Sequence, residues 1–270
     1  MADVTARGLR FHVQTLPGSP DAPAVVFLHG LVMDNLSSFY YTLAGPVTGA
    51  GFRSVLYDLR GHGRSERPPA GYGAADGVAD LFGVLDALGE RRPVHLVANS
   101  FGGVIALNAA LARPDRIAGL VMIEAHGPAG RGGDWTEAML NTLTKHALVL
   151  EYERLADQMF AIGWRKRGKQ AMVCDALING TTLLDDLAGL EPIRPAELAD
   201  VRCPVLAVYG EHSDIASAGR LLGEHVPECT LRMMPGIGHT VLREGTADLL
   251  DVMLPWLTAQ AGLPVPTVEV

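Results

Sequence analysis

A serine stands at the junction of an apolar run and an alanine-rich segment near the middle of the chain. The run Val94–Val97 leads into Ala98-Asn99-Ser100-Phe101-Gly102-Gly103. Small residues two positions before and two positions after Ser100 let the backbone fold tightly. A strained strand–turn–helix of this kind lifts one hydroxyl clear of a sheet. The pattern predicts that Ser100 is a nucleophile, with Ala98 where a glycine is commoner.

A serine hydroxyl needs a base to take its proton and a third group to orient that base. His239 lies in a glycine-flanked loop after the apolar run Thr230–Met234 and is the predicted base. Asp214 follows the apolar run Pro204–Tyr209 and is the predicted orienting acid, with Glu211 in the same loop as an alternative. The order serine, aspartate, histidine along the chain is one of the known triad orders.

The reaction also needs donors for a developing oxyanion. His29-Gly30-Leu31 follows another apolar run, Ala24–Leu28. The backbone N–H groups of Leu31 and Phe101 are the predicted oxyanion hole. His29 is expected to shape this turn through its own hydrogen bonds. Asp58, Arg60 and His62 are expected to tie a neighbouring loop together.

The elements that must position these residues alternate along the chain. Continuously apolar runs are typical of parallel strands covered on both faces, and strands that alternate with helices predict a doubly wound sheet. Functional groups in such sheets gather beyond the carboxyl ends of the strands, where Ser100, Asp214 and His239 are expected. The predicted strands are Leu9–Thr15, Ala24–Leu28, Arg53–Tyr57, Pro93–Ala98, Ile117–Ile123, Pro204–Tyr209 and Thr230–Met234. The predicted helices are Phe39–Thr48, Ala74–Leu88, Phe101–Ala112, Ser217–His225 and Thr246–Ala259.

Taken together in this order and spacing, these motifs resemble the α/β-hydrolase superfamily, in its capped serine type. The matching segments are His29-Gly30, the loop Asp58–Ser65, the elbow at Ser100, Gly210–Asp214 and Gly238-His239. The resemblance covers nearly the whole chain. It implies an α/β-hydrolase fold, a mostly parallel doubly wound sheet with an inserted helical cap. Some members place the acid at the end of the preceding strand, which makes Glu124 an alternative to Asp214.

The alternation of strands and helices breaks between about Pro128 and Arg194. This all-helical stretch matches the family's cap position, so the expected domains are a core of residues 1–127 and 195–270 and a cap of residues 128–194. A cap over a serine site creates a pocket. The residues expected to bind substrate are Asn99, Trp135, Met139, Phe160, Trp164 and Thr240.

Composition excludes several classes of function. The 270 residues carry a net charge of −8, whereas a nucleic-acid binder is normally basic. The three cysteines and nine histidines show no metal-ligand spacing, so neither a metal nor a cofactor is expected. The first residues contain no apolar h-region and no apolar run approaches 18 residues, which favours a cytoplasmic protein without a membrane anchor. Arginine far outnumbers lysine, a bias common in GC-rich bacterial genomes.

Two features bear on the substrate. Asn99-Ser100-Phe101-Gly102-Gly103 resembles the elbow of carbon–carbon hydrolases that act on meta-cleavage products, but Thr240 stands where those enzymes tend to carry tryptophan. The segment Arg165–Lys169 places four cations in five positions of an acidic chain. It is either a solvated turn or a dock for coenzyme A or an acyl carrier protein.

The sequence therefore predicts a serine hydrolase that cleaves an ester-like bond in a small, largely apolar molecule through an acyl-enzyme. Thioesterase, acyltransferase and carbon–carbon hydrolase activities remain alternatives. So does a small-molecule receptor that retains the triad. Serine at the elbow argues against haloalkane dehalogenase and epoxide hydrolase chemistry, because those reactions use an aspartate nucleophile. The oligomeric state is not predicted.

Overall fold

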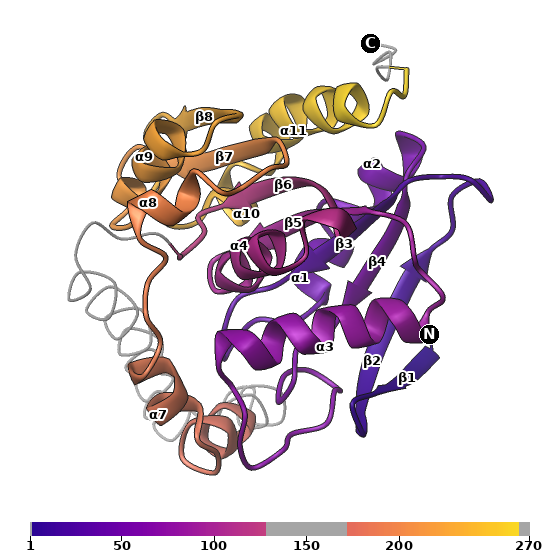
Figure 1. Cartoon of the computed structure of the whole chain (residues 1–270), viewed down its shortest axis with the longest axis vertical. Coiled ribbons are helices and arrows are strands. Elements are labelled where there is room, and N and C mark those ends of the chain that lie inside the picture. The colour runs from indigo at the N-terminus through magenta and orange to yellow at the C-terminus, as the bar shows by residue number, and fades with distance from the viewer. Residues whose placement is uncertain (1, 128–171, 265–270) are drawn as a thin grey trace, which may run out of the picture.

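The computed structural model describes residues 2–127 and 172–264. Its centre is one eight-stranded sheet in the order β1-β2-β4-β3-β5-β6-β7-β8 (Figure 1). Strands β3 to β8 pair in parallel, whereas β1 and β2 pair antiparallel with each other and β2 pairs antiparallel with β4. The strands are β1 Ala2–Ala6, β2 Leu9–Leu16, β3 Ala24–Leu28, β4 Arg53–Tyr57, β5 Val94–Asn99, β6 Ile117–Ile123, β7 Val205–Gly210 and β8 Cys229–Met234.

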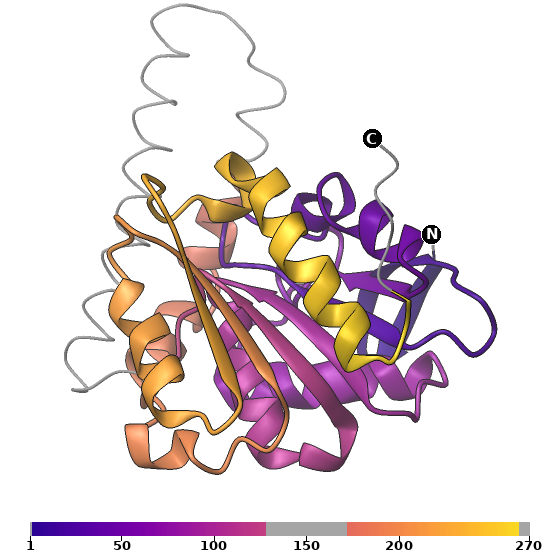
Figure 2. The same ribbon diagram turned by 90° about the horizontal axis from the view of Figure 1, so that it is seen from above.

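Helices cover both faces of the sheet. One face is covered by α3 Ala74–Ala87, α4 Gly102–Ala112 and α9 Ala216–His225. These helices lie in front of the sheet in the view of Figure 1. On the other face lie α2 Ala44–Gly49, α10 Val241–Glu244 and α11 Thr246–Gln260, and Figure 2 shows α11 crossing the sheet on the side opposite α4. The short elements α1 Ser37–Tyr40, η1 Pro114–Arg116, α7 Leu183–Ala188 and α8 Pro195–Leu198 complete the described chain.

The double coverage accounts for the unbroken apolar runs of the central strands. Residues of β3, β5, β6 and β7 are nearly all buried, since each side chain meets a helix layer whichever way it points. Leu96 and Ala98 of β5 pack in the core beneath α3 and α4, whereas Val97 packs in the core beneath α2 and α11. The predicted α/β-hydrolase architecture, a mostly parallel doubly wound sheet, is confirmed.

Two details differ from the sequence expectation. The predicted helix Phe39–Thr48 is two short helices, α1 and α2, because Pro46 cannot donate to a preceding carbonyl and is accommodated only in the first turn of α2. Strand β1 was not expected, since it is a short edge strand with polar Asp3 and Thr5.

The boundaries of the predicted cap, residues 128–194, remain a prediction. Residues 128–171 lie outside the described residues. Residues 172–178 and α7 are helical, as expected for a cap. In the described residues, no helix is both long and apolar enough to cross a membrane.

His95 on β5 gives the fold a measurable pH dependence. Its side chain is buried, and its Nδ1 has no hydrogen-bond partner among the described residues. Burial lowers the pKa of His95 to about 4. His95 is therefore protonated below about pH 6.5 in the unfolded chain but only below about pH 4 in the native chain. The free energy of unfolding falls as pH drops from about 6.5 to about 4.

We expect His95→Leu to flatten the loss of stability between pH 6.5 and pH 4.5, by up to about 1.4 kcal/mol for each pH unit. Urea unfolding followed by circular dichroism measures this slope. Exposed His225, replaced by glutamine, is the control and should keep the wild-type slope. Parallel curves for wild type and His95→Leu would contradict the assignment.

Candidate active site

Ser100 occupies the tight turn between β5 and α4 that the sequence predicts. Its φ is +52°, a left-handed conformation that costs energy for a residue with a side chain. A Cβ on Gly102 would lie 2.1 Å from the Leu28 carbonyl oxygen, and one on Gly103 would lie 2.3 Å from the Ala125 Cβ. Only glycine lets α4 begin this close to the ends of β3 and β6, and the turn must therefore be sharp.

Backbone hydrogen bonds fasten this turn to the end of β6. The Ser100 N–H donates to the Ile123 carbonyl at 3.1 Å, and the His126 N–H donates to the Ser100 carbonyl at 3.0 Å. Glu124, between them, also has a left-handed φ of +45°. The residues that follow two adjacent parallel strands thus form one unit at the carboxyl edge of the sheet.

The His239 ring is held by a carboxylate of that unit. Its Nδ1 lies 2.9 Å from Glu124 Oε2, and the Glu124 side chain is only 1% exposed. Glu124 accepts two further hydrogen bonds, from the Ser213 hydroxyl at 2.5 Å and from the Gly210 N–H. Because Nδ1 donates to Glu124, the assigned tautomer leaves the Nε2 lone pair of His239 for another proton.

Asp214 does not make the hydrogen bond expected of it from the sequence. Its Oδ1 is 4.0 Å from His239 Nδ1, and its side chain is 44% exposed. This corrects the expected geometry: the longer side chain of Glu124 reaches the ring from the sheet. Asp214, on the loop after β7, lies farther from the ring than Glu124 does. Glu211 turns elsewhere and accepts the Gly236 N–H.

The turn after β3 and the start of α4 each bring one further N–H group to the site. Leu31 and Phe101 are buried, and their N–H groups have no acceptor among the described residues. Gly30, just before Leu31, approaches Ser100 so closely that a Cβ on it would lie 3.3 Å from the Ser100 Cβ and 3.7 Å from Asn99 Nδ2. The arrangement resembles an oxyanion hole, with two donors that have no acceptor among the described residues near the Ser100 turn.

Buried histidines fix the shape of that turn. His29 Nδ1 lies 2.7 Å from the Gly30 carbonyl, and its Nε2 accepts the Leu59 N–H. His62 Nδ1 lies 2.8 Å from the Arg60 carbonyl, and its Nε2 accepts the N–H of Val32, whose φ is +62°. Burial chiefly, and His29 next, lower the pKa of His62 to about 3, so the acceptor nitrogen stays unprotonated.

The expected structural role of the loop after β4 is confirmed. Asp58 accepts the N–H groups of Leu36 and Arg64, which joins this loop to the start of α1. Arg60 makes a bidentate, buried ion pair with Asp80 of α3, at 2.5 and 2.6 Å. The sequence did not predict the hydrogen bond from the Val32 N–H to His62 Nε2, because nothing in the sequence identifies Val32 as the partner of His62.

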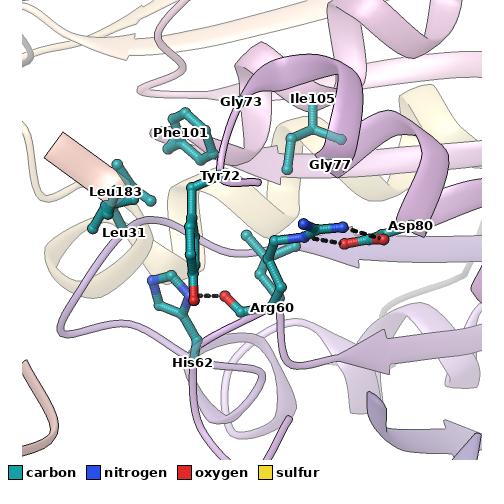
Figure 3. A pocket seen from close by; sticks show the side chains of 11 residues that line it. Leu31, Arg60, His62, Tyr72, Gly73, Gly77, Asp80, Phe101, Ile105 and Leu183 are labelled. Carbon is teal, nitrogen blue, oxygen red and sulfur yellow. Dashed lines mark hydrogen bonds and ion pairs between the residues drawn. The ribbon is translucent and has the colours of Figure 1, made fainter. Parts of the chain in front are cut away.

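A mainly apolar pocket lies next to the predicted oxyanion donors. The side chains of Leu31, Phe101 and Leu183 stand at one end, and Ile105 of α4 lines another wall (Figure 3). The Arg60–Asp80 pair closes the far end (Figure 3). The lining is therefore mainly apolar, with polar groups contributed by Arg60, Asp80, His62 and Tyr72.

Only two of the predicted substrate-binding residues, Asn99 and Thr240, lie within the described residues. Asn99 ends β5 beside Gly30, and Thr240 precedes α10 immediately after His239. Both are half-buried. Trp135, Met139, Phe160 and Trp164 lie outside the described residues, as does the basic segment Arg165–Lys169.

Known proteins resemble this chain in sequence over segments of different length. Epoxide hydrolase B of Mycobacterium tuberculosis is 36% identical over 132 residues, which is 48% of this chain and 36% of that protein. The chain spans well under half the length of the first curated relatives it matches. An sn-1-specific diacylglycerol lipase of Mus musculus is 27% identical over 93% of this chain and 86% of its own length.

Solved structures and family signatures agree with the fold. The crystal structure of the enol-lactonase of Burkholderia xenovorans superposes with a TM-score of 0.72 at 21% identity, over 95% of this chain and all of the other. The family model described as alpha/beta hydrolase family matches residues 25–252. With Ser100, His239 and Glu124 gathered at the carboxyl edge of its sheet, the chain belongs to the alpha/beta hydrolase family.

Proposed function

We propose that this protein is a serine hydrolase that cleaves an ester-like carbonyl bond in a small, largely apolar substrate. The observation that carries the proposal is the left-handed Ser100 turn beside two uncommitted N–H groups, those of Leu31 and Phe101. A histidine held by a buried carboxylate, His239 on Glu124, stands at the same edge of the sheet. Nucleophile, base, orienting acid and oxyanion donors are the parts that acyl transfer requires.

The proposed reaction has two halves. Ser100 Oγ attacks the carbonyl carbon while His239 Nε2 takes the hydroxyl proton, and the new oxyanion accepts the Leu31 and Phe101 N–H groups. His239 then gives the proton to the leaving oxygen, and the acyl group stays on Ser100. Water, deprotonated by His239, attacks the acyl-enzyme; His239 then returns this proton to Ser100 Oγ as the acyl bond breaks, which releases the acid and free Ser100. Glu124 holds the imidazole and stabilises its protonated form throughout.

The mainly apolar lining of the pocket beside Leu31 and Phe101 favours an apolar substrate. Its walls include Ile105 and Leu183. The likeness to a lipase over 93% of this chain also favours an ester of an apolar acid as substrate.

An epoxide hydrolase is the second candidate, because several curated relatives carry that name. That chemistry uses a carboxylate nucleophile that forms an ester with the opened epoxide. Ser100 occupies the elbow position here, which disfavours it. Thioester cleavage, acyl transfer, carbon–carbon cleavage and a slow-turnover receptor share the same Ser100 machinery, and turnover of matched substrates separates them.

A phosphonate probe tests the nucleophile without knowledge of the substrate. A fluorophosphonate should label Ser100 covalently with loss of fluoride, and peptide mass spectrometry should place the adduct on the Ser100 peptide. A receptor with the triad would label but turn over p-nitrophenyl butyrate slowly, whereas an esterase would do both. Absence of the adduct in folded protein would refute the proposal.

Ser100→Ala should lower kcat for p-nitrophenyl butyrate at least ~10³-fold, because the triad acts as a unit. Thermal unfolding should change little, since alanine keeps the same backbone. Ser217→Ala, on the exposed side of α9, is the matched control and should keep wild-type kcat. A Ser100→Ala preparation with near-normal kcat would exclude Ser100 as nucleophile.

The two carboxylates near His239 can be ranked. We expect Glu124→Gln to lower kcat ~10³- to 10⁴-fold, since loss of the orienting carboxylate of a triad has an effect of this size. Asp214→Asn should cost less than about tenfold, because its carboxylate is 4.0 Å from Nδ1 and exposed. Glu211→Gln in the same loop is the control. The reverse ranking would return the acid to Asp214, as the sequence alone suggested.

A further inference from the structure

The proposed mechanism leaves unused a histidine that lies against His239. The rings of His126 and His239 have centroids 5.7 Å apart and are tilted by 55°. The backbone N–H of His126 donates to the Ser100 carbonyl. His126 is therefore fixed next to both the nucleophile and the base.

His126 also carries an unsatisfied polar atom. The side chain is 2% exposed, and its Nε2 has no hydrogen-bond partner among the described residues. Burial chiefly, and His239 next, lower the pKa of His126 to about 3, so the ring is neutral with one donor and one acceptor nitrogen. Buried polar atoms are normally hydrogen-bonded, and an unpaired one next to a catalytic centre points to a functional role.

The geometry of the triad indicates which part of a substrate lies near His126. Glu124 engages Nδ1 of His239, so Nε2 serves the substrate and protonates the leaving oxygen. The carbonyl oxygen is held by the Leu31 and Phe101 N–H groups. The leaving group must therefore lie on the His239 side of the site, which is the side where the His126 ring packs.

We propose that His126 is a specificity-determining residue that hydrogen-bonds to a hydroxyl group on the leaving alcohol, two or three bonds beyond the ester oxygen. The preferred substrates are then esters of hydroxylated alcohols, with the apolar character confined to the acyl side. The inference depends on the proposed ester hydrolysis. It assigns a partner to the Nε2 atom, which has none among the described residues.

A pair of isosteric esters isolates this hydrogen bond. 2-Hydroxyethyl butyrate and propyl butyrate share the acyl group and differ by one hydroxyl in place of a methyl. We expect wild type to favour the hydroxylated ester about tenfold in kcat/KM, as one well-placed hydrogen bond supplies. His126→Phe should reduce this ratio to near one, and His126→Gln, which keeps a polar atom near the Nε2 position, should restore part of it.

The ratio is taken within one preparation, so the fraction of active protein cancels. If His126→Phe does not fold, His126→Met serves the same purpose. His95→Leu removes another buried histidine with an unpartnered nitrogen, away from the triad, and should keep the wild-type ratio. If His126 had a purely structural role, its substitution would lower kcat/KM for both esters by the same factor and leave their ratio unchanged.

Failure of this inference and failure of the proposed function give different results. If the phosphonate labels Ser100 and wild type hydrolyses p-nitrophenyl butyrate, a ratio that is the same in wild type and His126→Phe overturns the role of His126 alone. If Ser100 is not labelled and no ester is cleaved, the hydrolase mechanism itself falls, and the role of His126 falls with it.

Discussion

The close approach of α4 to the carboxyl end of β3 is the constraint on which the site depends. Gly102 lies where any Cβ would overlap the Leu28 carbonyl. Helix α4 can therefore start directly against the strand, which forces Ser100 into a left-handed turn and brings the Phe101 N–H toward the turn that carries Leu31. A larger residue at position 102 would push the helix outward and separate Ser100 and the Phe101 N–H from the turn that carries Leu31.

Neutral imidazoles provide the second layer of support. His29 and His62 each pair one ring nitrogen with a backbone carbonyl and accept a backbone N–H at the other nitrogen. This bridging works only while the ring is uncharged, since a protonated ring has no acceptor. For His62, burial supplies that condition by lowering the pKa of the ring to about 3, and the left-handed Val32 beside Leu31 is held in place as a result. The donors near Ser100 are thus positioned before any substrate arrives.

The sequence predicted the sheet well because its central strands are covered on both sides. Continuous apolar runs of strand length, such as Ile117–Ile123, are typical of buried parallel strands, and the small residues around Ser100 specify one sharp turn. Edge strand β1 was missed because polar residues on a partly exposed strand resemble a loop. Pro46 splits one predicted helix into two.

The site was predicted only in part, because the order of residues in the sequence does not determine which side chain reaches His239. Ser100 and His239 come from turns whose glycines mark them. The choice between Asp214 and Glu124 depends on how the loop after β7 runs, and on a side chain one methylene longer that starts from a neighbouring strand. Local patterns do not contain that information. The expected pocket residues between 128 and 171 lie outside the described chain.

The placement of Glu124 has a consequence for how freely this protein can diverge. Ser100 and Glu124 end adjacent strands, and the Ser100 N–H bonds directly to the residue before Glu124. On the proposed mechanism, two of the three reacting groups share one rigid register, and only His239 arrives from elsewhere. The part of the loop beyond Ser213 then does not need to supply the orienting acid. Evolution can lengthen or reshape it, as exposed loops tolerate, and so retune which molecules enter while the reaction centre stays intact.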